Sequence, residues 1–392
     1  MAGKYYLDEL KNFPKKITDK VESPCFIVNE DLLKRNLEIL SLVKEKTGAK
    51  ILLALKGFAM YSTFPLISRY LDGVCASGAI EARLGKEEFG KEVDTFSPAY
   101  PDSEIKDVIK YSDKIVFNSI SQWKKYRKLI KQSGRKIEIG LRVNPCYSEV
   151  ETDLYNSALP GSRLGMLPQD LESENLTGVD GLHFHALCEQ NSDVLVRVLK
   201  SFEKMYGRYI KEMKWVNFGG GHHITRKDYD VNLLVNTVNN FKKKYGVQVY
   251  LEPGEAVALN TGILVGTILD VIHNIKDIAI LDVSAEDHMP DVLAMPYRPN
   301  IIGAGLPNEQ KYTYTLGGST CLAGDVIGDY SFSQKLSPGD RLVFLDMAHY
   351  SMVKTTMFNG VRNPSIALYK PKSGKARILK RFGYNDYKER LS

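Results

Sequence analysis

The sequence predicts an α/β protein that consists of a (β/α)8 TIM barrel and a second, mostly β domain. Between residues 50 and 252, short apolar runs alternate with longer amphipathic stretches, and eight such units match the pattern of a barrel. After about residue 265 the alternation stops, and strand-like runs follow one another through turns such as the SPGD segment at 337–340. No low-complexity linker separates the two parts. We therefore expect a barrel over residues 30–262 and a β domain from residues 1–29 and 263–392.

The individual elements follow from these runs. We expect the barrel strands at residues 51–56, 73–77, 93–97, 114–118, 136–143, 181–186, 215–218 and 247–252. The intervening helices are expected at residues 63–71, 79–89, 103–111, 121–130, 194–209 and 231–245. The strands of the β domain are expected at residues 263–272, 277–283, 312–316, 341–346 and 376–381, and residues 25–28 are a candidate further strand.

The composition is that of a globular protein. Of the 392 residues, 43% are hydrophobic and 26% are charged, which is enough apolar material for a sizeable core. The formal net charge is +6, but basic and acidic residues are interspersed and no block of like charges stands out. We therefore expect a mildly basic, solvated exterior and no nucleic-acid partner.

The cysteines and the N-terminal stretch indicate the compartment. The five cysteines are odd in number and form no CxxC pair, which argues against a disulfide framework or a zinc ribbon. The first 16 residues contain no apolar core of a secretory signal, and no run approaches the roughly 18 apolar residues of a membrane span. We expect a cytoplasmic protein with no membrane association.

Candidate reactive residues stand where the predicted barrel strands end, which is where barrel active sites lie. Lys56 closes the apolar run ILLALK. A buried ammonium group is costly, and desolvation lowers the pKa of a lysine and makes it a Schiff-base nucleophile. The alternative is a lysine whose stem packs at the strand end while its ammonium group reaches water.

Two histidines end the sixth predicted strand. His183 and His185 are two residues apart, so their side chains share one face of a strand. One could be a core histidine, while the other could stack on or hydrogen-bond to a ligand. An HxH pair also suits a metal ion, although no further histidine or carboxylate cluster completes a ligand set.

A glycine run and a carboxylate end the last two predicted strands. Gly219, Gly220 and Gly221 would let backbone N–H groups approach an anion, at a position where barrels often bind phosphate. Glu252 could hold a pyridine nitrogen protonated and so make the ring an electron sink. The alternatives are an ordinary turn and a solvated carboxylate. Together with Lys56 and a ring-facing histidine, these residues match one cofactor, pyridoxal 5′-phosphate.

Seven segments carry a family resemblance over nearly the whole chain. They are ALKGF, GLHFHAL, NFGGGH, LEPGEA, HMPDVLAMPYRP, GGSTCLAGD and DMAHYSMVKTTMFNG. In this order the chain resembles the fold-type III, alanine-racemase-like pyridoxal-phosphate decarboxylases, which include the ornithine and diaminopimelate decarboxylases. Within that group the segments are most similar to those of the carboxynorspermidine/carboxyspermidine decarboxylases.

The resemblance implies roles for individual residues. Lys56 would hold the cofactor covalently, and His185 would lie against its ring. Gly219 to Gly221 and Tyr350 would contact its phosphate, and Glu252 would pair with its pyridine nitrogen. In the homodimer that the resemblance implies, Cys321 and Asp325 would be contributed across the subunit interface. Cys321 would then be the acid that protonates the carbanion.

Departures from the family pattern bear on the substrate. Many relatives have an arginine after EPG, where this chain has Glu255, and a glutamate suits a cationic tail. Asp291 could bind a second amine, and Arg298 could hold the end that bears the carboxylate. Cys188 stands where relatives have a serine that contacts the phosphate.

The sequence thus predicts the decarboxylation of carboxynorspermidine and/or carboxyspermidine to norspermidine or spermidine, with no metal. A diaminopimelate or other basic amino-acid decarboxylase is the main alternative. A non-catalytic cofactor-binding relative and a metal-dependent barrel hydrolase that uses His183 and His185 are more distant alternatives.

Overall fold

The structure of the protein is a computed structural model that describes residues 8–392 and divides into two compact units. One unit is Arg35–Val257, and the other combines Met1–Lys34 with Ala258–Ser392. Residues 1–7 lie outside the described part. The predictions for the 1–29 segment and for the N-terminal 16 residues therefore apply to the structure only from residue 8 on.

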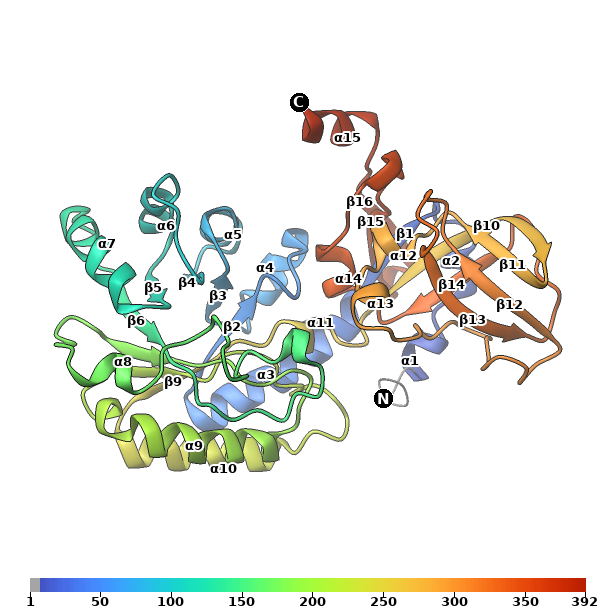
Figure 1. Cartoon of the computed structure of the whole chain (residues 1–392). Helices are drawn as coiled ribbons and strands as arrows, with labels where there is room; N and C mark the ends of the chain where they lie inside the picture. The colour runs from blue at the N-terminus through green and yellow to red at the C-terminus, as the bar shows by residue number, and fades with distance from the viewer. Residues whose placement is uncertain (1–7) are drawn as a thin grey trace. The chain divides into compact units, whose positions relative to one another are not determined.

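The first unit is a closed barrel of eight parallel strands in chain order, as the sequence predicts (Figure 1). Its strands are β2 (Lys50–Ala54), β3 (Gly73–Ala76), β4 (Glu92–Phe96), β5 (Lys114–Phe117), β6 (Glu138–Arg142), β7 (Gly181–His183), β8 (Trp215–Asn217) and β9 (Gln248–Leu251). β9 pairs with β2 and closes the barrel. Both faces of the strands are covered, which explains why they read as continuous apolar runs.

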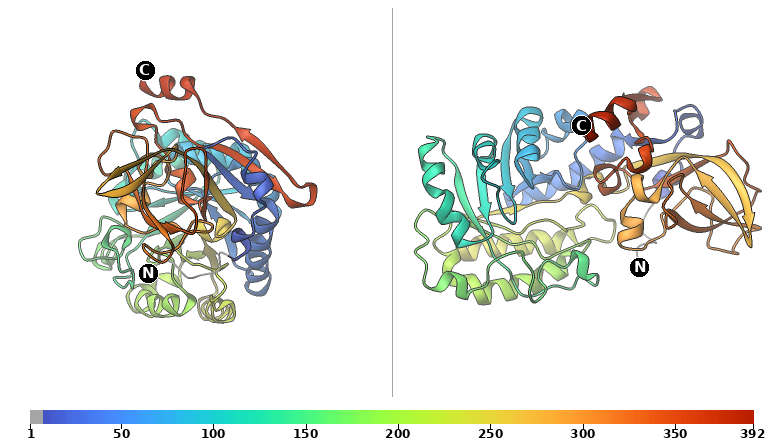
Figure 2. Two further views of the ribbon diagram at one scale, coloured as in Figure 1. Left: turned by 90° about the vertical axis from the view of Figure 1, so that its right-hand side faces the viewer. Right: turned by 45° about the horizontal axis from the view of Figure 1, so that its top comes forward.

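Helices surround the barrel strands. They are α3 (Glu30–Thr47), η1 (Tyr61–Thr63), α4 (Phe64–Ile67), α5 (Ala79–Leu84), the π-helical turn η2 (Gly85–Phe89), α6 (Ile105–Tyr111), α7 (Ile120–Gln132), η3 (Asp153–Tyr155), α8 (Gln169–Glu172), α9 (Ser192–Ile210), α10 (Val231–Tyr245) and α11 (Glu255–Ala258). The two long helices α9 and α10 lie side by side, as both views of Figure 2 show. The buried residues of α9, such as Val198, Phe202 and Tyr206, recur every four residues and form the face turned to the barrel.

Three strands predicted to carry site residues end earlier than the sequence indicates, and β9 ends at Leu251, one residue before Glu252. β2 ends at Ala54 because the chain turns there, with the N–H of Gly57 donating to the carbonyl of Ala54 at 3.0 Å. β7 ends at His183, two residues before His185. Both Lys56 and His185 therefore lie in the loops that follow the strands.

The second unit is a mixed, mostly β structure, as predicted. Its strands are β1 (Cys25–Asn29), β10 (Gly262–Asn274), β11 (Lys276–Leu281), β12 (Tyr312–Gly317), β13 (Val326–Phe332), β14 (Arg341–Leu345), β15 (Ser365–Lys370) and β16 (Lys375–Lys380). They lie in the order β13-β12-β11-β10-β1-β15-β16, and β14 pairs with β10. β1 pairs with β10 and β15, which confirms that the 25–28 segment joins this domain. β13 and β15 were not predicted.

The helices of the second unit are short. They are α1 (Asp8–Lys11), α2 (Lys15–Thr18), α12 (Ala285–His288), α13 (Asp291–Ala294), α14 (Tyr350–Val353), η4 (Phe358–Gly360), η5 (Pro371–Ser373) and α15 (Tyr384–Leu391). Its core contains apolar residues from α1, α2, β1, β10, β14 and β15, among them Phe13, Ile27 and Val265. Among residues 8–392, no helix is both long enough and apolar enough to pass through a bilayer.

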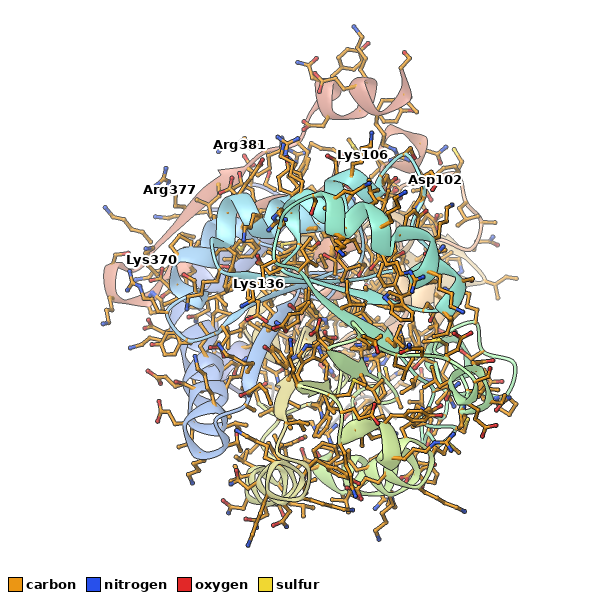
Figure 3. The ribbon with its side chains drawn as sticks, turned by 90° about the vertical axis from the view of Figure 1, so that its left-hand side faces the viewer. Asp102, Lys106, Lys136, Lys370, Arg377 and Arg381 are labelled. Atoms are coloured by element: carbon orange, nitrogen blue, oxygen red, sulfur yellow. The ribbon has the colours of Figure 1, made fainter. Side chains whose placement is uncertain are left out.

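Exposed charges of both signs are distributed over the two units. In the barrel unit, Asp102 accepts a hydrogen bond from the ammonium group of Lys125 at 2.9 Å. In the β unit, the basic residues Lys370 and Arg381, which Figure 3 labels, form ion pairs with Glu30 and Glu22. These basic side chains are thus neutralised locally by acidic partners on the same unit.

Candidate active site

The barrel unit brings several predicted site residues to the same end of the barrel. Lys56 follows β2, His183 and His185 end or follow β7, and Glu252 follows β9. The carboxyl ends of parallel barrel strands face one side, so these residues share the face where barrel active sites are built. Lys56 is exposed, so the expectation of a buried lysine is wrong for this structure; its predicted role rests on position alone.

Glu252 is held by side chains from the two strands that precede its own in the barrel, β7 and β8. The side-chain amide of Asn217 donates to its Oε1 at 2.7 Å, and His183 Nε2 lies 3.3 Å from its Oε2. Burial by itself raises the pKa of Glu252. Attraction to His183, the hydrogen bonds from His183 and Asn217, and the charge of Lys56 outweigh that effect, so the net direction is downward and the carboxylate stays ionised.

His183 is kept neutral in this arrangement. Burial lowers its pKa, and the attraction of Glu252 only partly opposes this. A neutral His183 that carries its proton on Nε2 donates to Glu252, which fixes the tautomer. The imidazole also stacks on Phe96, with ring centroids 5.5 Å apart. His183 is therefore a support for Glu252.

His185 is oriented by the glycine loop. The backbone N–H of Gly220 donates to its Nδ1 at 2.9 Å. Burial, together with the nearby cations Lys56 and Arg142, holds the pKa of His185 well below its usual range. His185 is thus a neutral imidazole with its proton on Nε2 and a fixed ring orientation.

The glycine loop leaves no space for side chains. A Cβ on Gly219 would lie 2.4 Å from the carbonyl oxygen of Phe184, and one on Gly221 would lie 1.9 Å from that of Leu187. Both glycines have positive φ, of 69° and 82°. The loop packs backbone to backbone against the chain that follows β7, which makes a cradle in which main-chain groups can approach an anion.

Two residues of this site were missed from the sequence. Asn217 ends β8, and its side chain both holds Glu252 and accepts from the N–H of Gly219 at 2.8 Å. Arg142 ends β6 and is buried, with its guanidinium 4.5 Å above the ring of Phe96. Burial lowers the pKa of Arg142 to about 10. The strand-end rule that selected Glu252 would have selected both residues.

The β unit carries the remaining predicted residues. Cys321 is an exposed free cysteine whose backbone N–H donates to Oδ1 of Asn359 at 2.7 Å. Asp325 is buried, and its carboxylate accepts hydrogen bonds from the Ser284 hydroxyl at 2.9 Å and from the N–H of Ala285 at 2.7 Å. The hydroxyl of Thr320 donates to it at 2.6 Å. In this structure Asp325 therefore fixes the loop that carries Cys321.

The two proposed substrate-binding residues of the β unit already have partners. The carboxylate of Asp291 accepts a hydrogen bond from the ammonium group of Lys354. The guanidinium of Arg298 donates to the carbonyl of Gly305 at 3.1 Å and lies 4.4 Å from the ring centroid of Tyr330. Tyr350 begins α14 and is half-buried.

The family follows from a comparison with known proteins. The family model described as "Pyridoxal-dependent decarboxylase, C-terminal sheet domain" matches residues 19–348. The chain belongs to this family. A carboxynorspermidine/carboxyspermidine decarboxylase of Campylobacter jejuni is 46% identical over 380 residues, which are 94% of this chain and 98% of the relative. The present chain is also 43% identical to a carboxyaminopropylagmatine decarboxylase of Synechocystis, over 94% of this chain and 95% of that relative.

The solved structures agree with this family. The crystal structure of carboxynorspermidine decarboxylase from Campylobacter jejuni, complexed with norspermidine, has a TM-score of 0.87 at 46% identity and covers 94% of this chain and 100% of that one. Diaminopimelate decarboxylase from Helicobacter pylori has a TM-score of 0.82 at 16% identity, over 98% and 99% of the two chains, which shows a shared fold.

The residues of the barrel unit fit the family's cofactor. The glycine loop offers a cradle that a Cβ would fill, and Glu252 is an ionised carboxylate that is suited to pair with a pyridinium. The rival metal site at His183 and His185 fits less well, since one ring nitrogen of each is committed to Glu252 or Gly220. Among the described residues, the single cluster with metal-ligand spacing contains neither histidine.

Proposed function

We propose that this decarboxylase acts on carboxynorspermidine and/or carboxyspermidine and releases norspermidine or spermidine in polyamine biosynthesis. The observation that carries the proposal is the half-buried, ionised Glu252 that follows β9, in a chain 46% identical to a Campylobacter enzyme of that name. Glu255 supports a cationic substrate, because a carboxylate in this position attracts amines and repels the second carboxylate of diaminopimelate.

The proposal assigns the cofactor contacts to the barrel unit. Pyridoxal phosphate, when bound, supplies an electron sink for the electron pair left on Cα as the carboxylate departs. Lys56 would hold it covalently, and the backbone of the Gly219–Gly221 loop would bind its phosphate, with Tyr350 as a further contact. Glu252 would keep its pyridine nitrogen protonated, and His185 would lie against its ring.

Further residues are assigned to the substrate and to proton transfer. Glu255 and Asp291 would bind amines of the substrate chain, and Arg298 would bind its carboxylate-bearing end. The Cys321 thiol would return a proton to Cα. The proposal includes a cytoplasmic homodimer in which each protomer contributes Cys321 and Asp325 to its partner's site.

Subunit complementation tests the shared site. The Lys56→Ala and Cys321→Ala proteins would each be inactive or nearly so. If the site is shared, mixed dimers of the two variants regain activity, because one of their two sites contains both native residues. Mixtures that exchange subunits and stay inactive would contradict the shared site.

A substrate panel tests the reaction itself. Protein loaded with pyridoxal phosphate is assayed for carbon dioxide release from carboxynorspermidine, carboxyspermidine, carboxyaminopropylagmatine and diaminopimelate. We expect turnover of the two carboxylated triamines. They differ by one methylene, so we expect their kcat/KM values to differ by about 10- to 200-fold at most. Preferential turnover of carboxyaminopropylagmatine or diaminopimelate would replace the proposed substrate and leave the decarboxylase assignment intact.

A further inference from the structure

The barrel unit contains a cluster of three residues, of which the sequence predicted only Glu255 as a site residue. Ligand atoms of Glu189, His223 and Glu255 lie within 4.8 Å of one another. His223 Nε2 is 3.3 Å from Oε2 of Glu255. His223 is buried, with 5% of its surface exposed, whereas Glu189 is exposed. The cluster therefore reaches from solvent to the interior of the unit.

His223 provides a second, independent indication of a ligand. Among the described residues, neither of its buried ring nitrogens has a hydrogen-bond partner, even though Nε2 is close to Glu255. A buried imidazole without a hydrogen bond loses the interactions it had with water. A donor group placed between His223 and the two carboxylates would restore them.

Hydrogen bonds to main-chain carbonyls join the segments that carry the three residues. The N–H of Gln190 donates to the carbonyl of Gly221 at 3.1 Å, and the N–H of His223 donates to the carbonyl of Gln190 at 3.2 Å. The hydroxyl of Thr225 donates to the carbonyl of Ala256 at 2.6 Å. These bonds fix the main chain of the segments that carry Glu189, His223 and Glu255.

The cluster adjoins the cofactor cradle. His223 is two residues beyond Gly221, and a Cβ on Gly221 would lie 2.9 Å from the backbone nitrogen of Cys188, the neighbour of Glu189. A Cβ on Gly57, the residue after Lys56, would lie 3.0 Å from the backbone nitrogen of Glu255. The two segments that form the cradle thus continue into the cluster, and Glu255 joins them from the segment packed against Gly57.

We propose that Glu189, His223 and Glu255 form a socket for the distal primary ammonium group of the substrate, and this inference rests on the proposed function. An ammonium group has three N–H donors, and the cluster offers three acceptors: two carboxylate oxygens and one imidazole nitrogen. The two negative charges match a cation, and hydrogen bonds between charged groups are the stronger kind. The socket adds Glu189 and His223 to Glu255 as residues that determine specificity.

Removing the distal amine provides the sharpest test. Carboxynorspermidine is 2-amino-4-(3-aminopropylamino)butanoate, and 2-amino-4-(propylamino)butanoate lacks only its distal amine while the amino-acid head fixes the orientation. We expect the wild-type holoenzyme to prefer the first compound by about 10- to 100-fold in kcat/KM. In Glu189→Gln, Glu255→Gln and His223→Asn, most of that preference disappears. The control Glu212→Gln, an exposed glutamate that follows α9, keeps it.

Direct binding gives a second readout. We expect calorimetry to show that norspermidine binds each socket variant about 10- to 100-fold more weakly, while the affinity for pyridoxal phosphate is unchanged. Glu189 is exposed, so Glu189→Gln tests the socket even if substitution of the buried His223 impairs folding.

Other outcomes overturn the inference. Variants could keep the wild-type preference for carboxynorspermidine over the analogue, or lose activity equally on both compounds. Either result would show that the cluster is only a structural ion pair. Stoichiometric zinc or manganese that is lost in His223→Asn would make it a metal site. If the wild-type protein decarboxylates neither compound, the proposed function itself fails, which is distinct from failure of the socket.

Discussion

Nε2 of His183 and Oε2 of Glu252 lie 3.3 Å apart, although the two residues come from strands that are not neighbours in the barrel. Asn217, at the end of the strand between them, donates to the other oxygen of Glu252 at 2.7 Å. Three consecutive strands thus hold one carboxylate ionised and in place. Such preorganisation suits a group that must stabilise a cation on a cofactor ring.

We expect Glu252→Gln to lower kcat by roughly 10- to 150-fold, which corresponds to the loss of a charge-assisted hydrogen bond of about 1.5–3 kcal/mol. The amide keeps the shape of the side chain but cannot hold a pyridinium. Steady-state carbon dioxide release measures the change, with Glu212→Gln as the charge-matched control. An unchanged kcat would remove Glu252 from the chemistry.

We expect Gly221→Ala to lose much of its affinity for pyridoxal phosphate, because its Cβ would lie 1.9 Å from the Leu187 carbonyl oxygen. Gly178→Ala is the matched control: its φ of 94° is also positive, but no atom lies within 4 Å of the new Cβ. The control should lose only about 1–2 kcal/mol of folding stability, through backbone strain, and should keep its affinity for the cofactor. Absorbance titration with the cofactor compares the two, and equal affinities would contradict a cradle at Gly221.

We expect the stability of the barrel unit to fall as the pH falls from 7 to 5, partly through His222. Burial lowers the pKa of His222 to about 4, whereas the unfolded side chain titrates near 6.5. Above pH 6.5 both states are neutral and the residue has no effect. Between 6.5 and 4 the unfolded state alone binds the proton, so the free energy of unfolding drops by about 2 kcal/mol by pH 5.

Urea denaturation of wild type and His222→Asn at both pH values checks this contribution. The comparison is between pH values, so the constant cost of the substitution cancels. We expect the variant to lose about 2 kcal/mol less than wild type between pH 7 and 5. His273→Asn, at an exposed histidine, should behave as wild type. An unchanged pH dependence in His222→Asn would show that His222 is not buried in its neutral form.

We expect Asp325→Ala to lower the free energy of unfolding by about 3 kcal/mol, because the substitution leaves several buried donors without an acceptor. Thermal unfolding of the cofactor-free protein measures the effect. Asp270→Ala, at an exposed aspartate, should change little. If Asp325→Ala is as stable as wild type but has a raised KM, the residue binds substrate, as the family resemblance implies, and does not act mainly as a support.

The barrel could be predicted because its two kinds of element have different patterns. Each buried parallel strand is apolar throughout, whereas apolar residues recur every three to four positions in each helix. Other elements lacked such a signal. β13 was missed because Gly328 and Asp329 interrupt its apolar pattern, and α3 was missed because it precedes the first strand of the barrel alternation. Strand ends were the least accurate feature, since turns such as the one from Ala54 to Gly57 depend on tertiary packing.

The candidate site was predictable to the extent that it obeys one rule, that reactive groups follow the ends of barrel strands. The rule indicated Lys56, His185, the glycine loop and Glu252. It could not indicate which side chains point at one another, so the hydrogen bond from Asn217 to Glu252 and the grouping of Glu189 with His223 are visible only in the structure. Spacing along the chain does not encode these contacts, because they join segments more than 30 residues apart.

Reductive trapping tests most directly whether Lys56 holds the cofactor for decarboxylation. The protein is loaded with pyridoxal phosphate, reduced with borohydride, digested and mapped by mass spectrometry. We expect one stoichiometric pyridoxyl label, on the peptide that contains Lys56, and neither label nor turnover in Lys56→Ala. A label on another lysine, or carbon dioxide release that persists in Lys56→Ala, would contradict this role of Lys56.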